Sequence, residues 1–122
     1  MEIEPVKDSR RFDRKKQIYD FVGRHCDSSG RARLFSGRTS DISLRGLGIL
    51  IDSKDVPGEG DTVDVRIRVF DDEPPLKVVG FVCWRRNEES GERKKARLGI
   101  ELTGMTDPVY SYRRWLEILT WN

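Results

Sequence analysis

The most regular pattern in this sequence lies between residues 62 and 69. Val63, Val65, Ile67 and Val69 alternate there with polar or charged residues. Successive side chains of a β-strand point to opposite faces, so a period of two indicates one buried face and one face in water. The segment therefore predicts a half-buried strand.

Five other segments have the composition of β-strands, with turn residues between them. They are residues 17–24, residues 31–39, the segment of Leu47, Ile49 and Ile51, residues 78–84 and residues 96–102. Residues 27–30 predict the turn between the first two strands, and residues 87–95 predict a polar hairpin tip between the last two. Arginines interrupt the alternation in residues 31–39, so this is the least regular of the six predicted strands.

A single helix is predicted from Pro108 to about Thr120. Asp107 is a candidate N-cap, and proline suits the first helical position because its missing N–H costs nothing there. The apolar side chains of this segment recur at helical spacing, namely Val109, Tyr112, Leu116 and Leu119. We expect this stripe to pack on the sheet. Six strands followed by one helix predict an antiparallel barrel, or an open antiparallel sheet covered by the helix.

Composition limits the classes of function. The chain has 122 residues, the size of one domain, and 23 basic against 21 acidic side chains leave a formal charge of +2. This balance gives little attraction to nucleic acid or to an anionic membrane, so any anion site must be local. The only histidine is His25, and Cys26 and Cys83 stand apart from each other. We therefore expect two reduced thiols and no metal site.

The sequence also lacks the signals of enzymes and of membrane segments. It has no nucleophile elbow and no glycine-rich phosphate loop ending in lysine, so we expect no catalytic activity. Its first residues are charged, and no apolar run approaches the roughly 20 residues of a membrane span. We expect a cytoplasmic location without direct membrane insertion.

Two short motifs are candidates for a binding site. Asp41, Ser43 and Gly46 have the spacing Asp-x-Ser-x-x-Gly directly before an apolar strand. Asp and Ser oxygens bond local backbone or a ligand edge, and glycine permits a close approach to the main chain. A plain β-turn closed by an Asx bond is the alternative interpretation. Upstream, Arg10 and Arg14 form an Arg-x-x-x-Arg motif in a basic segment, although Arg93 and Arg97 supply a second match.

The two motifs, in this order and separated by a hairpin-sized segment, resemble those of the PilZ domain, a receptor family for the bacterial second messenger cyclic di-GMP. The resemblance spans nearly the whole chain. It implies an all-β fold, a six-stranded antiparallel β-barrel with a C-terminal α-helix. We expect residues 1–16 to form a flexible N-terminal arm with the arginine motif, and residues 17–122 to form the barrel and helix.

The resemblance also implies which residues bind the ligand: Arg10, Arg14, Asp41, Ser43 and Gly46. A planar guanidinium binds phosphate or a guanine edge bidentately, and an ionised aspartate accepts from the two N–H donors on the Watson–Crick edge of guanine. Arg11 and Trp84 are secondary candidates, Arg11 for a phosphate and Trp84 for a place under a base. Packing on the barrel explains Trp84 equally well. No cofactor other than this ligand is expected.

These observations predict a non-catalytic receptor that binds cyclic di-GMP and signals to an unidentified effector protein. The arm has few apolar anchors, so we expect the ligand to order it across the barrel by bridging both motifs. One alternative is a PilZ-like module that acts through protein partners without binding the nucleotide. Another is a small arginine-rich barrel for single-stranded nucleic acid. That function needs aromatics on an open basic face, whereas most aromatics here occupy periodic core positions, so no nucleic-acid partner is expected.

Overall fold

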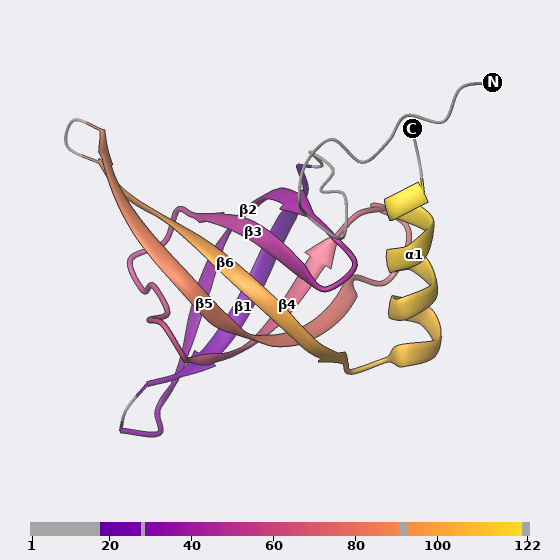
Figure 1. Cartoon of the computed structure of the whole chain (residues 1–122), viewed down its shortest axis with the longest axis horizontal. Helices are drawn as coiled ribbons and strands as arrows, with labels where there is room; N and C mark the ends of the chain where they lie inside the picture. Colours follow the sequence, from indigo (N-terminus) through magenta and orange to yellow (C-terminus); the bar gives the residue numbers. More distant parts are fainter. Residues whose placement is uncertain (1–17, 28, 91–92, 121–122) are drawn as a thin grey trace, which may run out of the picture.

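The computed structural model describes residues 18–27, 29–90 and 93–120. Its six strands form a closed antiparallel barrel in the order β1-β2-β3-β6-β5-β4 (Figure 1). The elements are β1 (Asp20–Cys26), β2 (Ala32–Ile42), β3 (Gly46–Ile51), β4 (Thr62–Arg68), β5 (Leu76–Ser90), β6 (Arg93–Met105), the π-helical turn η1 (Pro108–Tyr112) and the helix α1 (Arg113–Thr120). The predicted all-β barrel with a C-terminal helix is confirmed.

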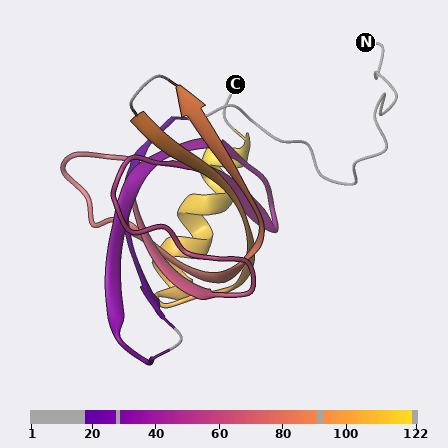
Figure 2. The ribbon, with the colours of Figure 1, turned by 90° about the vertical axis from the view of Figure 1, so that its left-hand side faces the viewer.

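Alternation along each strand fills the barrel. In β4, Val63, Val65 and Ile67 are buried in the core while the residues between them lie outside it. The helix lies across one end of the barrel, as Figure 2 shows in a view through the ring of strands. The core therefore consists of the inward faces of the strands, closed at one end by side chains of the helix, and its largest buried members include Trp115, Phe35, Ile42 and Leu47.

Three strands extend beyond the segments that the sequence pattern predicts. β2 continues to Ile42, so Asp41 lies in a strand rather than in the turn. β5 and β6 continue through much of the predicted hairpin tip and form a ribbon that projects beyond the barrel (Figure 1). Their register places Glu88 opposite Lys95. Opposite charges on facing strands stabilise a two-stranded ribbon, which accounts for the extended conformation of these polar residues.

The helix buries a different face from the one predicted. Val109, Tyr112 and Leu116 are 82%, 50% and 38% exposed, and of the predicted stripe only Leu119 packs against the core. Trp115 is fully buried instead, and its indole Nε1 donates to the Ser43 carbonyl oxygen at 2.9 Å. Burial of this large ring sets the rotation of the helix. The π-turn of η1 also holds more residues per turn than an α-helix. Apolar residues that were predicted to face the core from a period of 3.6 residues per turn therefore rotate away from it.

The start of the helical segment agrees with the prediction only in part. Pro108 is the first residue of η1, as expected, but Asp107 makes no side-chain capping bond. Its backbone carbonyl oxygen accepts from the Ser111 N–H at 2.8 Å. The Ser111 hydroxyl accepts from the Lys77 N–H at 3.0 Å, which ties the turn to the start of β5. Backbone and serine contacts therefore fix this end without the aspartate side chain.

Candidate ligand-binding surface

The Asp-x-Ser-x-x-Gly motif spans the β2–β3 hairpin, and its serine holds the turn. The Ser43 N–H donates to the Gly46 carbonyl oxygen at 2.8 Å, and the Ser43 hydroxyl donates to the same oxygen at 3.2 Å. With Trp115 bonded to its carbonyl oxygen, Ser43 connects the hairpin to the helix. A methyl group at Gly46 would lie 2.7 Å from the Ile100 carbonyl oxygen, so β6 requires a glycine here. These serine contacts close the turn.

Four residues on neighbouring strands form one row across the outside of the barrel. The register pairs Asp41 with Gly48, Gly48 with Gly99, and Gly99 with Trp84. The neighbours of both glycines along their strands point into the core, so the glycines themselves face outward. We call these four residues the glycine row. It brings Asp41 together with Trp84, two candidates that are 43 positions apart in sequence.

The side chains at the ends of the glycine row fold over its centre. A methyl group at Gly48 would lie 2.9 Å from Oδ2 of Asp41, and one at Gly99 would lie 2.1 Å from Nε1 of Trp84. The register shifts beside the row, at residues 39–41 of β2 and 82–84 of β5. Such irregularities change the direction of nearby side chains, which accounts for the position of the Asp41 carboxylate and the Trp84 indole above the backbone of the two glycines.

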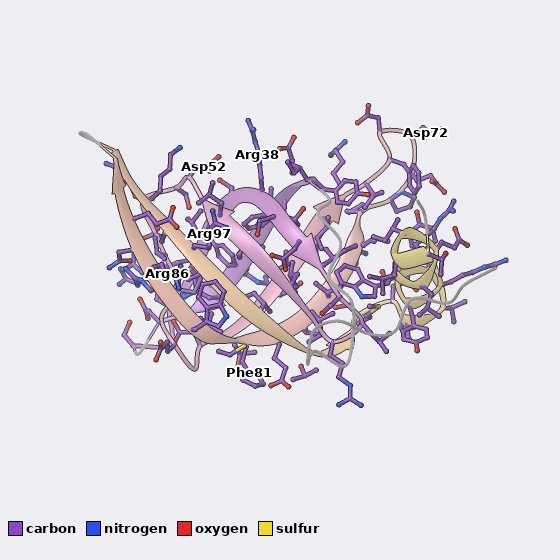
Figure 3. All side chains as sticks on the ribbon, turned by 45° about the horizontal axis from the view of Figure 1, so that its top comes forward. Arg38, Asp52, Asp72, Phe81, Arg86 and Arg97 are labelled. Atoms are coloured by element: carbon purple, nitrogen blue, oxygen red, sulfur yellow. The ribbon has the colours of Figure 1, made fainter. Side chains whose placement is uncertain are left out.

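Next to the glycine row lies a row with three arginines. The register pairs Arg38 with Leu50, Leu50 with Arg97, and Arg97 with Arg86. Figure 3 labels the three arginines, which follow one another across the sheet. The Arg86 guanidinium lies 5.9 Å from the centre of the Trp84 ring, and Arg97 forms an ion pair with Glu88 at 3.3 Å. We call Arg38, Leu50, Arg97 and Arg86 the arginine row.

The two rows together suit an anionic ligand with planar rings. A carboxylate accepts from ring N–H groups, an indole face stacks on a ring, and guanidinium groups bind phosphate. Trp84 is 38% exposed, so one part of its surface is open to a ligand. Gly48 and Gly99 were not among the predicted site residues. A glycine inside an alternating strand is a sequence signal for close approach of another group, and both residues carry that signal.

Of the other predicted site residues, only Ser43 and Gly46 belong to the part of the chain that the structure describes. Arg10, Arg11 and Arg14 fall outside the described residues, as does the predicted arm of residues 1–16. Ser43 and Gly46 lie at the hairpin turn beside Asp41, where Ser43 is only 6% exposed. The structure therefore places Asp41 and Trp84 on one row with two glycines that were not predicted.

A cavity lies apart from the two rows, and the described residues contain no candidate metal centre. The cavity, of about 370 Å³, lies over β1 and β4 and is lined by Arg24, His25, Asp61 and Asp64 among others, but by none of the predicted site residues. Within residues 18–27, 29–90 and 93–120, no group of three or more His, Cys, Asp or Glu side chains could hold a metal ion. Cys26 and Cys83 are both exposed thiols. None of the helices described is long and apolar enough to cross a membrane.

Comparison with known protein families gives a match over most of the sequence. The family model of the PilZ domain matches residues 8–117 of the sequence. No curated protein matches the sequence significantly.

Several solved structures share the fold. The PilZ domain of YcgR from Escherichia coli, determined with c-di-GMP, is 17% identical with a TM-score of 0.60, over 92% of this chain and 89% of that one. The PilZ domain of CeSA from a cellulose-synthesizing bacterium is 16% identical with a TM-score of 0.55, over 88% of this chain and 94% of that one. K. pneumonia MrkH is 16% identical with a TM-score of 0.66, over 96% of this chain but 49% of its own. The chain thus spans about half the length of MrkH, and likewise of MotI from Bacillus subtilis.

Proposed function

The chain belongs to the PilZ domain family, and on that premise we propose that it is a non-catalytic receptor that binds cyclic di-GMP. The observation that carries the proposal is the glycine row, where Asp41 and Trp84 lie over Gly48 and Gly99 beside three arginines. A solved relative, the PilZ domain of YcgR, was determined with c-di-GMP, which supports the choice of ligand.

The chemistry of the ligand matches the two rows group by group. The Watson–Crick edge of guanine presents N–H donors, for which the Asp41 carboxylate is an acceptor. A guanine ring can stack against the exposed part of the Trp84 indole, which lies over Gly99. The guanidinium groups of Arg86 and Arg97 suit the phosphates, because they bind oxyanions with charge-assisted hydrogen bonds.

Arg10 and Arg14 complete the proposed site from the other motif, with Ser43 and Gly46 at the hairpin and Arg11 as a further phosphate contact. In this proposal, the ligand orders residues 1–16 across the barrel and so presents a changed surface to an effector protein. Ordering a residue costs about 1–2 kcal/mol, so the arginine contacts must be charge-assisted to offset it. Amide hydrogen exchange tests the step: we expect fast exchange of residues 5–16 without ligand and slow exchange with it. Equal protection in both states would contradict it.

Titration calorimetry with cyclic di-GMP, with GTP and a short oligonucleotide as competitors, tests the proposed ligand. We expect saturable binding of cyclic di-GMP and a weakening of about 5- to 150-fold in Asp41→Ala and in Arg14→Ala, from 1–3 kcal/mol for one lost bidentate contact. Asp71→Ala, in the exposed loop after β4, is the matched control and should bind like the parent.

Two outcomes would replace this proposal. No heat at high ligand concentration would favour a PilZ-like module that acts through a protein partner alone. An oligonucleotide that binds more tightly and displaces cyclic di-GMP would favour a nucleic-acid function. Folded Asp41→Ala and Arg14→Ala variants that bind like the parent would leave the ligand in place but refute the site.

A further inference from the structure

The C-terminal helical segment carries an apolar stripe that faces away from the barrel. Val109, Tyr112 and Leu116 are 82%, 50% and 38% exposed. They lie on η1 and α1, whose opposite face covers the end of the barrel (Figure 1). Single exposed apolar residues are normal at a protein surface. Tyr112 and Leu116 lie one helical turn apart and Val109 precedes them in η1, so this segment exposes three apolar side chains, a feature typical of a helix interface.

The same segment already has a complete buried face. Trp115 and Ile118 are fully buried, and the hydroxyl of Ser111 is bonded to the Lys77 N–H. Arg114 further fixes the segment, because it forms ion pairs with Glu73 and Glu117 and its guanidinium lies 5.0 Å from the centre of the Phe70 ring. With this face holding the helix in place, the exposed stripe contributes nothing to the barrel core.

Charged residues flank the stripe in a self-complementary pattern. Arg113 and Glu117 follow Tyr112 and Leu116 by one residue each, so both lie on the same flank of the helix. Their side chains lie 3.8 Å apart, and the Arg113 side chain is 80% exposed. When two identical helices pair in antiparallel orientation about a two-fold axis, the same side of each helix contacts the same side of the other. Arg113 of one copy then faces Glu117 of the other.

We propose that this stripe is a self-association surface, on which a second copy of the chain docks through an antiparallel pair of these helices. Tyr112 and Leu116 of the two copies form its apolar centre, and the Arg113–Glu117 pairs lie at its rim. One pair of short helices buries little area, so association is weak, with a dissociation constant on the order of 10–100 µM. The surface lies on the helix rather than on the glycine row, and the proposal does not depend on the nucleotide.

Sedimentation analysis of the ligand-free protein between about 1 and 500 µM tests this proposal. We expect a monomer at the low end and a dimer at the high end of that range. Leu116→Glu should remain monomeric at all concentrations, because a charge in the apolar centre is buried on association. Leu34→Glu is the matched control, since Leu34 is 67% exposed on β2 and lies outside the stripe. It should dimerise like the parent.

A mixing experiment tests the antiparallel geometry. Arg113→Glu places like charges opposite each other in its own dimer, and so does Glu117→Arg, so each alone should associate at least fivefold more weakly than the parent. A mixture of the two restores both opposite-charge pairs and should recover association. Circular dichroism would check the fold of Glu117→Arg, which also loses its contact with Arg114. A monomeric parent at 500 µM, loss of the dimer in Leu34→Glu, or no recovery on mixing would overturn the proposal.

Discussion

Replacing Gly99 by alanine should remove one wall of the proposed site without disturbing the core. The new methyl group would lie 2.1 Å from Nε1 and 2.4 Å from Cε2 of Trp84. Ordinary contacts between such atoms are about 3.5–4.0 Å, so the indole must move by roughly 1.5 Å. It can do so because it lies on the outside of the barrel and is 38% exposed.

The expected cost falls on binding rather than on stability. A base stacked on an aromatic ring contributes about 1–3 kcal/mol, so Gly99→Ala should weaken cyclic di-GMP binding about 5- to 150-fold. The free energy of unfolding should change by less than about 1 kcal/mol, since alanine favours an ordered backbone over glycine and the displaced ring was partly in water. Calorimetric titration gives the affinity, and urea denaturation gives the stability.

Gly104→Ala is the matched control in the same strand. Its methyl group would meet only Cγ2 of Val79, at 3.9 Å, which is an ordinary contact. This variant should bind like the parent. If Gly99→Ala also binds like the parent, Trp84 does not contribute to the site. If it unfolds at much lower urea concentration than Gly104→Ala, the indole is part of the barrel packing and the reasoning from its exposure is wrong.

Three further predictions concern the carboxylate, the salt dependence and the first hairpin. Gly48→Ala would place a methyl group 2.8 Å from Oγ of Ser40 and 2.9 Å from Oδ2 of Asp41, so both side chains must move and cyclic di-GMP binding should weaken by fivefold or more in calorimetry; unchanged affinity would exclude the carboxylate in its present position. Because two phosphates replace few counterions, the affinity for cyclic di-GMP should fall by less than tenfold between 50 and 200 mM salt, whereas a steeper loss would indicate a nucleic-acid-like track. Hydrogen bonds from the Ser29 and Arg33 side chains and the Arg31 N–H hold the pKa of Asp27 well below its usual range. A lowered pKa stabilises the folded state above the unfolded pKa of about 4, and this stabilisation is lost as the pH falls toward the folded pKa. The Arg31 amide should therefore exchange with solvent faster at pH 2 than its intrinsic exchange rate explains. Constant protection of this amide would contradict the prediction.

Local periodicity was sufficient to predict the six strands, whereas the closed barrel was implied by the resemblance to the PilZ domain. The strict alternation of Val63, Val65 and Ile67 fixes which face of β4 is buried, because a shift of one residue would put charged side chains into the core. The ribbon of β5 and β6 is polar in sequence, so its extent depends on cross-strand charge pairs that only the register reveals.

The rotation of the helix could not be read from its own sequence. The stripe of Val109, Tyr112 and Leu116 has the correct period, but Trp115 is buried because its indole reaches the Ser43 carbonyl oxygen, 72 positions away. The glycine row is a similar case. Asp41 was predicted from its motif and Trp84 as a secondary candidate, but their proximity arises from the pairing of four strands and from two register shifts. The assignments of Arg10, Arg11 and Arg14 remain predictions.

The most direct test of the central claim is a titration of the isotope-labelled protein with cyclic di-GMP, followed by amide and indole N–H chemical shifts. The glycine row predicts the largest shifts at the Gly48 and Gly99 amides and at the Trp84 indole Nε1–H, with the Gly60 amide at the cavity of β1 and β4 unchanged. No shifts at saturating ligand, or shifts gathered around His25 and Asp61 while Gly48, Gly99 and Trp84 stay constant, would contradict it.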